Sequence, residues 1–372
     1  MKHTLFITQR CNLACRYCYI HKKNITLSLE MAEKIIDYIF AHTPEDDTVD
    51  IGFFGGEPLL EFYLLKDISE IVVQHPSYSA DRVVLRLVSN GTLFSDEVAS
   101  FLDEYSIGFG ISCDGPPFVQ DRSRVFKNGK GTSKVVEENL KHALKYFPIM
   151  PVNAVYSAKT VKYLPETIDY FSGLGIKNIH LNPDISSKWG IDDTACLEDI
   201  YAQIGQQYID FYMEGEPRYI SLIDSKITVI LRGGYRPEEK CSMGKGEFAY
   251  APSGNIYPCE RLVEGDDGGF HCLGNIKNDS ILPVRCEGSL GITTNIECHS
   301  CSLEEYCMNW CGCTNYFSTG KYNQVNHLIC ASEKAAIQAA VGVIEKTRES
   351  GISFSEHLSG TPLMSIIGEV SS

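Results

Sequence analysis

Three cysteines stand close together near the start of the chain, in the stretch QRCNLACRYCY (residues 9–19). Cys11, Cys15 and Cys18 fall within eight positions, and the next cysteine in the sequence is Cys113. A closed structural zinc site takes four ligands, usually as two close pairs, whereas a four-iron cluster takes one thiolate for each iron. Three thiolates without a fourth nearby predict a metal centre with one position left open. A zinc site completed by a remote residue is the alternative.

A second cysteine-rich region extends from Cys241 to Cys330 and contains ten of the 15 cysteines. It is also rich in glycine, so it can bury little apolar surface, and bound metal is expected to hold it together. An odd number of cysteines in a chain without a signal peptide points to metal binding or catalysis and not to a disulfide framework. A zinc ribbon is the alternative for part of this region.

Composition excludes several classes of protein. The formal charge of −15 argues against a general affinity for nucleic acid or for an anionic membrane surface, because both require a basic face. The N-terminal MKHTLFITQRCN lacks the apolar run of a signal peptide, and no stretch approaches the roughly 20 apolar residues of a spanning helix. We therefore expect a cytoplasmic protein. Its hydrophobic content of 44% is sufficient for a substantial core.

Short apolar runs alternate with helical patterns through the first half of the chain. The expected strands are residues 4–8, 49–54, 83–88, 107–112, 151–156 and 177–182. The expected helices between them are residues 28–42, 59–74, one opened by Ser95, 133–146 and 163–173. Six strand–helix units predict a parallel sheet with right-handed crossovers, curled into a full or partial barrel, whose chemistry lies on the loops after the strands. The three-cysteine loop follows the first strand.

Four segments are expected along the chain. Residues 1–190 form the barrel, and residues 191–235 form a helical connector with helices near 194–214 and 219–231. Residues 236–330 form the cysteine-rich domain, and residues 331–372 form a final helix and a polar tail.

The spacing C-x3-C-x2-C after the first strand resembles the radical S-adenosylmethionine (SAM) enzymes, in which the residue before the third cysteine is typically aromatic, as Tyr17 is. The resemblance implies a partial (β/α)6 barrel of the TIM type. It also implies a [4Fe–4S] cluster on Cys11, Cys15 and Cys18, whose open iron binds the amino and carboxylate groups of SAM.

Further segments match the SAM cradle of that family. GGEP after the second strand matches the segment that holds the methionine amino group; glycines let backbone carbonyls approach, and the glutamate supplies negative charge for an ammonium. An arginine in DRSR matches the one that grips the cofactor carboxylate. A plain turn and a solvated arginine are the alternatives. The cradle residues that the resemblance implies are Tyr17, Gly55, Gly56, Glu57, Pro58, Asn90, Ser112 and Arg124.

The second half resembles the SPASM domain, which implies two auxiliary [4Fe–4S] clusters and three clusters in all. The matching pattern is Cys241-x12-Gly254-x4-Cys259, then Cys298-x2-Cys301-x5-Cys307-x3-Cys311, then Cys330. By position in the family, the outer cluster takes Cys298, Cys301, Cys307 and Cys330, and the inner cluster takes Cys241, Cys259 and Cys311.

The chain departs from the sulfatase maturases of this family at one ligand. Those enzymes place a fourth inner-cluster cysteine before the position of Gly254, whereas residues 242–253 contain none. The inner cluster is therefore expected to keep one iron open; Cys272, in a glycine-rich loop thirteen residues after Cys259, is the main alternative as fourth ligand, and Cys286 and Cys313 are the others. Glu260 follows Cys259 where those enzymes have an acidic residue proposed as a base, and a surface carboxylate is the alternative. The remaining cysteines, Cys113 and Cys196, are expected to be inert apolar residues.

The resemblance implies that an electron from the first cluster cleaves SAM to methionine and a 5′-deoxyadenosyl radical, which takes a hydrogen atom from the substrate. The auxiliary clusters then accept an electron while a base removes a proton. We favour a maturase that forms a cysteine thioether in a ribosomally made peptide, because an open inner iron could hold a substrate thiolate. Oxidation of Cys or Ser to formylglycine in a sulfatase is the second hypothesis.

A non-enzymatic iron–sulfur electron carrier is the hypothesis from another class. The GGEP segment and Arg124 argue against it, because an electron carrier needs no site for SAM. The expected partners are a peptide or protein substrate and a reductant such as flavodoxin or ferredoxin, with no nucleic acid and no membrane. Only ten residues precede Cys11, so recognition of a leader peptide would need another surface or another protein.

Overall fold

The computed structural model describes residues 1–278, 295, 298–349 and 354. The chain divides into two compact units. Unit 1 comprises Met1–Ser112, Ser123–Tyr146 and Ser242–Arg285, and unit 2 comprises Cys113–Arg122, Phe147–Cys241 and Cys286–Ser372.

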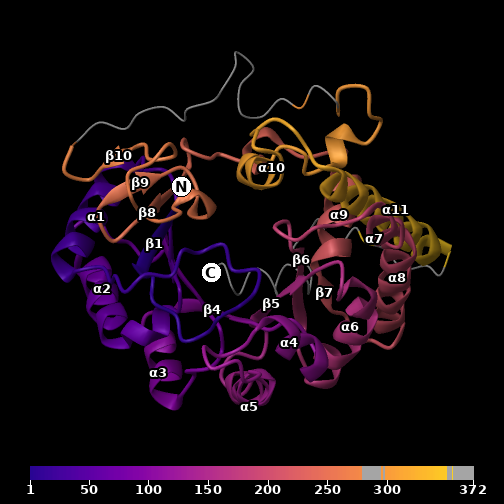
Figure 1. Cartoon of the computed structure of the whole chain (residues 1–372), viewed down its shortest axis with the longest axis horizontal. Helices are drawn as coiled ribbons and strands as arrows, with labels where there is room; N and C mark the ends of the chain where they lie inside the picture. The colour runs from indigo at the N-terminus through magenta and orange to yellow at the C-terminus, as the bar shows by residue number, and fades with distance from the viewer. Residues whose placement is uncertain (279–294, 296–297, 350–353, 355–372) are drawn as a thin grey trace. The chain divides into compact units, whose positions relative to one another are not determined.

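Unit 1 is built on a sheet whose order is β10-β9-β8-β1-β2-β3-β4 (Figure 1). The parallel strands β1 (Lys2–Thr8), β2 (Val49–Gly55), β3 (Val83–Ser89) and β4 (Ile107–Ser112) follow chain order. The cysteine-rich region adds β8 (Glu247–Tyr250), parallel to β1, and the antiparallel β9 (Asn255–Tyr257) and β10 (Gly274–Asn275). The short helix η4 (Glu260–Leu262) follows β9.

Helices cover the outer face of this sheet (Figure 1). They are α1 (Leu29–His42), η1 (Pro58–Glu61), α2 (Phe62–Gln74), α3 (Asp96–Glu104) and α5 (Ser133–Ala143). Ser28 and Ser95 cap α1 and α3 by accepting hydrogen bonds from the backbone N–H groups of Met31 and Val98. Alternate residues of β2 and β3 are buried, while those between them face the other side of the sheet.

Unit 2 contains the parallel strands β5 (Pro151–Tyr156), β6 (Asn178–Pro183) and β7 (Tyr219–Ile220). Its main helices are α4 (Pro117–Ser123), α6 (Leu164–Gly173), α7 (Ile191–Ala195), α8 (Leu197–Met213), α9 (Ser221–Arg232), α10 (Gly312–Thr319) and α11 (His327–Glu349). Unit 2 also contains the short 3-10 helices η2 (Val161–Tyr163), η3 (Pro237–Glu239) and η6 (Glu304–Tyr306).

Helix α11 is the longest helix among the described residues, and its segment His327–Arg348 is long and apolar enough to cross a membrane by length and composition. In the structure it packs against α8 and α9. Gly205 of α8 makes the packing close, because a Cβ there would lie 3.2 Å from Val343. The apolar face of α11 is therefore explained by the core of unit 2.

All six predicted strands are present, and the α/β fold class is confirmed. The final helix begins at His327 and not at residue 331. The strands β7 and β8–β10 were not predicted, because each has only two to four residues. Residues 242–278 group with the first strands, since β8 pairs with β1 and removes an open edge of the sheet.

Candidate active site

The three cysteines of the first loop come together at the end of β1. Cys11 is buried, and Cys15 and Cys18 are half-buried. Burial raises the pKa of the Cys11 and Cys15 thiols, and the nearby Cys18 thiol raises both pKa values further. The positive charges of Arg124 and Lys22 partly offset the rise in the pKa of Cys15. Each thiol thus interacts with the others, and the set matches the donors that an iron–sulfur cluster requires.

Hydrogen bonds hold this loop from two sides. The N–H groups of Ala14 and Arg16 donate to the carbonyls of Val125 (2.7 Å) and Ser123 (3.0 Å). The N–H of Leu13 lies 3.4 Å from Cys11 Sγ, and Nδ2 of Asn90 lies 3.9 Å from the same sulfur. Donors directed at a ligand sulfur stabilise its thiolate and tune a cluster's reduction potential.

The two glycines of GGEP are required by a close approach of two loops. The N–H of Gly56 donates to the Thr8 carbonyl at 2.8 Å, and the N–H of Glu57 donates to the Arg10 carbonyl at 2.9 Å. A Cβ on Gly55 would lie 2.1 Å from the Thr8 oxygen, and one on Gly56 would lie 2.1 Å from the Arg10 oxygen. The segment GGEP therefore lies directly against the cysteine loop.

Glu57 connects the loops that follow β2 and β3. It is 1% exposed, and its carboxylate accepts hydrogen bonds from the Leu59 N–H (3.0 Å), the Ser89 hydroxyl (3.0 Å) and the Asn90 N–H (2.7 Å). Burial raises its pKa to about 7, against the effect of these hydrogen bonds and of Arg124. From the sequence, the Glu57 carboxylate was expected to attract the ammonium group of a ligand. In the structure, it also accepts hydrogen bonds that connect the loops after β2 and β3.

The other cradle residues lie on several segments of unit 1. Arg124 is 7% exposed, and its guanidinium carbon lies 5.4 Å from the centre of the Tyr17 ring. Pro58 opens η1, and Ser112 ends β4. Asn90 also donates from Nδ2 to Asn12 Oδ1 at 2.8 Å, so it connects the loop after β3 with the cysteine loop.

The four cysteines of the predicted outer cluster interact with one another in unit 2. Burial raises the pKa of the Cys298 thiol, and the nearby Cys330 and Cys301 raise it further. Burial likewise raises the pKa of the Cys307 thiol, and the nearby Glu333 and Cys298 raise it further. Four thiols within mutual electrostatic range form a donor set that fits a four-iron cluster.

Of the predicted inner-cluster cysteines, Cys259 lies in unit 1 and is 4% exposed. Its Sγ and carboxylate oxygens of Glu247 and Glu260 all lie within 4.8 Å of one another. The Cys259 thiol donates to Glu260 Oε2 at 3.4 Å. Burial and the neighbouring Glu260 raise the pKa of Glu247 to about 7, although Lys2 opposes this. Sequence reasoning missed Glu247, although it lies in the segment where a fourth ligand was sought.

The candidates for that ligand have other surroundings. Cys272 packs against an apolar cluster that includes Phe6 and Tyr257, and its thiol donates to the Gly274 carbonyl at 3.2 Å. Cys313 is buried in unit 2, with its Sγ 3.7 Å from that of Cys311. Cys286 lies outside the described residues, and Cys241 belongs to unit 2.

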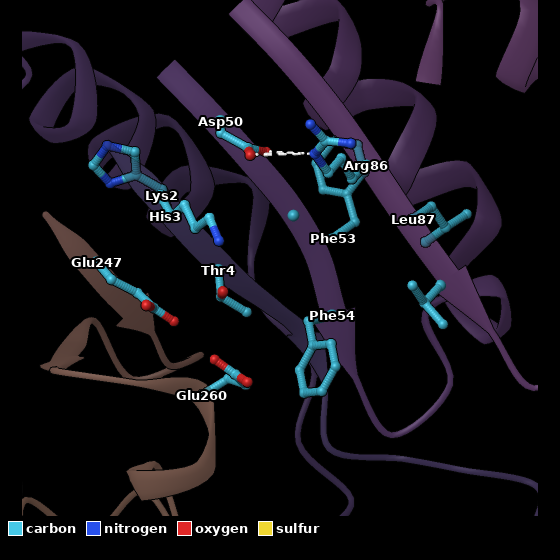
Figure 2. A pocket seen from close by; sticks show the side chains of 12 residues that line it. Lys2, His3, Thr4, Asp50, Phe53, Phe54, Arg86, Leu87, Glu247 and Glu260 are labelled. Carbon is cyan, nitrogen blue, oxygen red and sulfur yellow. Dashed lines mark hydrogen bonds and ion pairs between the residues drawn. The ribbon is translucent and has the colours of Figure 1, made fainter. Parts of the chain in front are cut away.

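A cavity of about 490 Å³ opens on the face of the unit 1 sheet opposite the helices. Figure 2 shows side chains of β1, β2 and β3 along it, with Glu247 and Glu260 at one end. The other end carries an ion pair in which Arg86 Nε lies 3.0 Å from Asp50 Oδ1. The paired carboxyl groups beside Cys259 are therefore open to a ligand in the cavity.

A parallel α/β sheet with a buried three-thiol loop at the end of its first strand and a glycine segment against that loop defines a cluster-binding barrel protein. The chain belongs to the radical SAM superfamily, whose family profile matches residues 5–171. It is 30% identical, over 299 residues, to an uncharacterised protein of Methanocaldococcus jannaschii; the match covers 77% of this chain and 94% of that protein.

Relatives with an assigned activity are more distant. The cysteine-type anaerobic sulfatase-maturating enzyme of Clostridium perfringens (strain ATCC 13124) is 24% identical over 81% of this chain and 85% of its own. The solved structure of anSMEcpe with AdoMet and Cp18Cys peptide superposes with a TM-score of 0.76, at 20% identity, over 94% of this chain and 99% of that one. Streptococcus suis SuiB bound to precursor peptide SuiA gives a TM-score of 0.58 at 16% identity, over 88% and 75%.

The superfamily identifies this protein as an enzyme that uses SAM and a [4Fe–4S] cluster. Three thiols with N–H donors directed at one of them fit that cluster, and the adjoining GGEP segment and Arg124 fit the cofactor beside it.

Proposed function

We propose that this protein is a peptide maturase that joins a cysteine sulfur to a carbon of the same ribosomally made peptide. The observation that carries this proposal is the group formed by Cys259, Glu247 and Glu260, which contains one thiol and opens into the cavity on the sheet. A substrate thiol in that cavity would meet a carboxylate to receive its proton and the edge of a predicted cluster to bind its sulfur.

The peptide class is supported by the substrates of similar structures. anSMEcpe was solved with the Cp18Cys peptide, and SuiB was solved with the precursor peptide SuiA. Both share the fold of this chain, and a cavity lined by charged and aromatic side chains is suited to a peptide segment.

The residues divide the work as follows. Cys11, Cys15 and Cys18 would hold the first cluster, and Gly55, Gly56, Glu57 and Arg124 would support SAM beside it. When bound, these groups supply a 5′-deoxyadenosyl radical that removes one hydrogen atom from a substrate carbon. Glu260 would accept the thiol proton at a carboxylate oxygen, and the apolar wall around Phe54 would keep water away.

The balance of the reaction is one C–H and one S–H bond broken and one C–S bond formed. The hydrogen atom would leave in 5′-deoxyadenosine, Glu260 would hold the proton, and an auxiliary cluster would take up the remaining electron. The outer set Cys298, Cys301, Cys307 and Cys330 would hold one such cluster, and Cys241, Cys259 and Cys311 would hold the other, which gives three clusters in all.

Oxidation of a sulfatase cysteine or serine to formylglycine is the second candidate. The similarity to the Clostridium perfringens sulfatase-maturating enzyme over 81% of this chain supports it. The same base and electron acceptor would serve, since that reaction also removes one hydrogen atom, one proton and one electron.

Mass spectrometry separates the two reactions. Reconstituted enzyme with SAM and reduced flavodoxin is incubated with cysteine-containing peptides encoded beside its gene, and separately with a sulfatase peptide. A thioether product loses two hydrogens and its alkylatable thiol but keeps its sulfur; a formylglycine product made from cysteine loses its sulfur. If reduced enzyme forms no 5′-deoxyadenosine, an electron carrier becomes the better interpretation.

A further inference from the structure

We infer that the buried ammonium of Lys226 raises the reduction potential of the outer auxiliary cluster, so that this cluster can accept an electron from the substrate. This role rests on the proposed function in one respect, namely that the four cysteines of the predicted outer set hold a four-iron cluster. Those cysteines and the residues that surround Lys226 all belong to unit 2.

Lys226 is a buried cation whose donors are all used. Its side chain, on α9, is 4% exposed. Its ammonium has three donors and lies 2.5 Å from Glu333 Oε2, 3.2 Å from the Tyr306 carbonyl and 3.3 Å from the Tyr235 hydroxyl. Glu333 comes from α11, which packs against α9 (Figure 1). Burial lowers the pKa of Lys226, but Glu333 and Tyr235 raise it above its usual value, so the side chain keeps its charge.

This charge acts on a predicted cluster ligand. The Cys307 thiol is hydrogen-bonded to the Glu333 carboxylate, which also accepts the N–H of Met308. Burial raises the pKa of Cys307 and Glu333 raises it further, whereas Lys226 lowers it, because a nearby cation stabilises the thiolate. Lys226 is therefore within electrostatic reach of a ligand sulfur of the outer set.

The sign of the effect follows from the charge that a cluster gains. A four-iron cluster with four thiolates becomes more negative by one unit when it is reduced, so a cation beside it stabilises the reduced state more than the oxidised state. A carboxylate has the opposite effect. Because both side chains are largely shielded from solvent, salt and water screen these interactions little. Lys226 should therefore raise the potential, and Glu333 should lower it.

Packing alone does not require a charge at this position. Ile223 and Ile227 of the same helix are buried, so the core around α9 accepts apolar side chains. A buried ion pair can often be replaced by apolar residues of similar volume without loss of stability. The charge of Lys226 is thus better explained by the ligand beside it than by the stability of the helix pair.

The proposed reaction has a use for such a charge. One electron remains after the hydrogen atom and the proton have left the substrate, and a higher potential of the outer cluster favours its transfer from the substrate radical. Lys226 acts through its charge and through Glu333, so it is a positioning residue.

The experiment uses the full-length chain with Cys11, Cys15 and Cys18 changed to Ala, so that only auxiliary clusters form. This parent protein is reconstituted anaerobically and titrated with dithionite at about pH 8.5, above the ordinary pKa of a glutamate, while electron paramagnetic resonance follows each cluster. The signal that disappears in Cys330→Ala belongs to the outer cluster. The iron content of every variant is measured in parallel.

Lys226→Met should lower the midpoint potential of the outer cluster. We expect at least a tenfold change in the equilibrium constant of reduction, which is about 59 mV for one electron. Lys226→Arg keeps the charge and should retain most of the parent potential, whereas Glu333→Gln should raise the potential. The matched control is Lys334→Met, which removes an exposed cation from the next position of α11 and should leave the potential unchanged.

The direction of the shifts separates charge from packing. An unchanged potential in Lys226→Met, or shifts of the same sign in Lys226→Met and Glu333→Gln, would overturn the inference and leave the proposed function intact. If Lys226→Met binds less iron than the parent protein, the other two variants decide: the inference stands only if arginine retains the potential and Glu333→Gln raises it.

Two further results distinguish the inference from the proposed function. A parent protein without a signal that depends on Cys330 would remove the outer cluster, and the inference with it. The expected shifts together with a missing thioether product would support the inference and remove only the proposed function.

Discussion

Lys226 and Glu333 form an ion pair inside unit 2, with Nζ 2.5 Å from Oε2 and side chains that are 4% and 12% exposed. Lys226 also donates to the Tyr306 carbonyl at 3.2 Å, and the same Glu333 oxygen accepts the N–H of Met308. The pair thus connects α9 and α11 to the two residues on either side of Cys307. The Lys226–Glu333 ion pair therefore holds the backbone on both sides of Cys307, a predicted cluster ligand.

Lys226→Met should therefore lower the free energy of unfolding by about 3 kcal/mol, because it leaves the buried Glu333 carboxylate without its cation. Urea denaturation followed by circular dichroism under anaerobic conditions measures the effect. The control is Lys34→Met, which removes an exposed pair with Glu30 and should change stability by less than about 0.5 kcal/mol. Equal effects in both variants would contradict the structural role of the buried pair.

Gly56→Ala should weaken binding of SAM at least tenfold, about 1.4 kcal/mol, because the new Cβ would lie 2.1 Å from the Arg10 carbonyl and must push the cysteine loop away. Equilibrium dialysis of labelled SAM measures this. Gly342→Ala is the control: its Cβ meets nothing within 4 Å, and alanine is favoured in the interior of α11, so binding should be unchanged. Normal affinity in Gly56→Ala would show that the loops tolerate separation.

Arg124→Ala should also reduce SAM affinity, and Arg124→Lys should restore it only in part, because a lysine cannot reproduce the planar, bidentate grip of a guanidinium on a carboxylate. Arg122→Ala, two residues away and exposed, is the matched control. Isothermal titration calorimetry on reconstituted protein separates affinity from turnover. The assignment of Arg124 fails if its alanine variant binds SAM as tightly as the control does.

His3 should make unit 1 sensitive to acid. It is 2% exposed, its two ring nitrogens lie 3.0 Å from the hydroxyls of Tyr250 and Thr43, and burial, assisted by the N-terminal charge, lowers its pKa to about 3. Between about pH 6.5 and pH 3 the unfolded chain binds a proton at His3 that the folded chain does not. This stability is present above pH 6.5 and is lost on acidification, with a slope of about 1.4 kcal/mol per pH unit.

His3→Gln should remove that slope. Urea titrations from about pH 6.5 down to about pH 4.5 compare the two proteins. Burial also lowers the pKa of His180 and His271, but their contributions cancel because both proteins contain them. The same pH dependence in the variant and the parent would contradict a neutral, buried His3.

Iron analysis tests the number of clusters. Anaerobically reconstituted protein should contain about twelve irons if three four-iron clusters form, and the Ala variant of Cys11, Cys15 and Cys18 should contain about eight. Changing Cys113 to Ala controls for loss of a thiol outside the predicted ligands. Stoichiometric zinc without iron in anaerobically purified protein would end the cluster assignment.

Features carried by single segments could be predicted from the sequence. Each main strand is an apolar run of five or six residues, and Ser95 was predicted to open a helix, as the structure confirms. The spacing of Cys11, Cys15 and Cys18 could be read in the same way, because the ligands share one loop.

Relationships between segments could not be predicted. The partners of the Glu57 carboxylate, Ser89 and Asn90, are adjacent only because parallel strands end at one edge of the sheet. Glu247 meets Cys259 through the register of a strand of four residues, which is too short to leave a periodic signal. The cysteine spacing showed that residues 242–253 contain no cysteine, but it could not show that Glu247 of this segment lies beside Cys259.

The pairing of Lys2 with Glu247 also bears on how the protein is made. The ribosome completes β1 about 240 residues before β8, which at 5–20 residues per second is a delay of roughly 10 to 50 s. During that time the backbone N–H and C=O groups along one side of β1 have no strand to pair with, and such an edge is a template for association with other chains. A nascent or truncated chain that ends before residue 247 should therefore require a chaperone, whereas the full-length chain seals the edge with its own late strand.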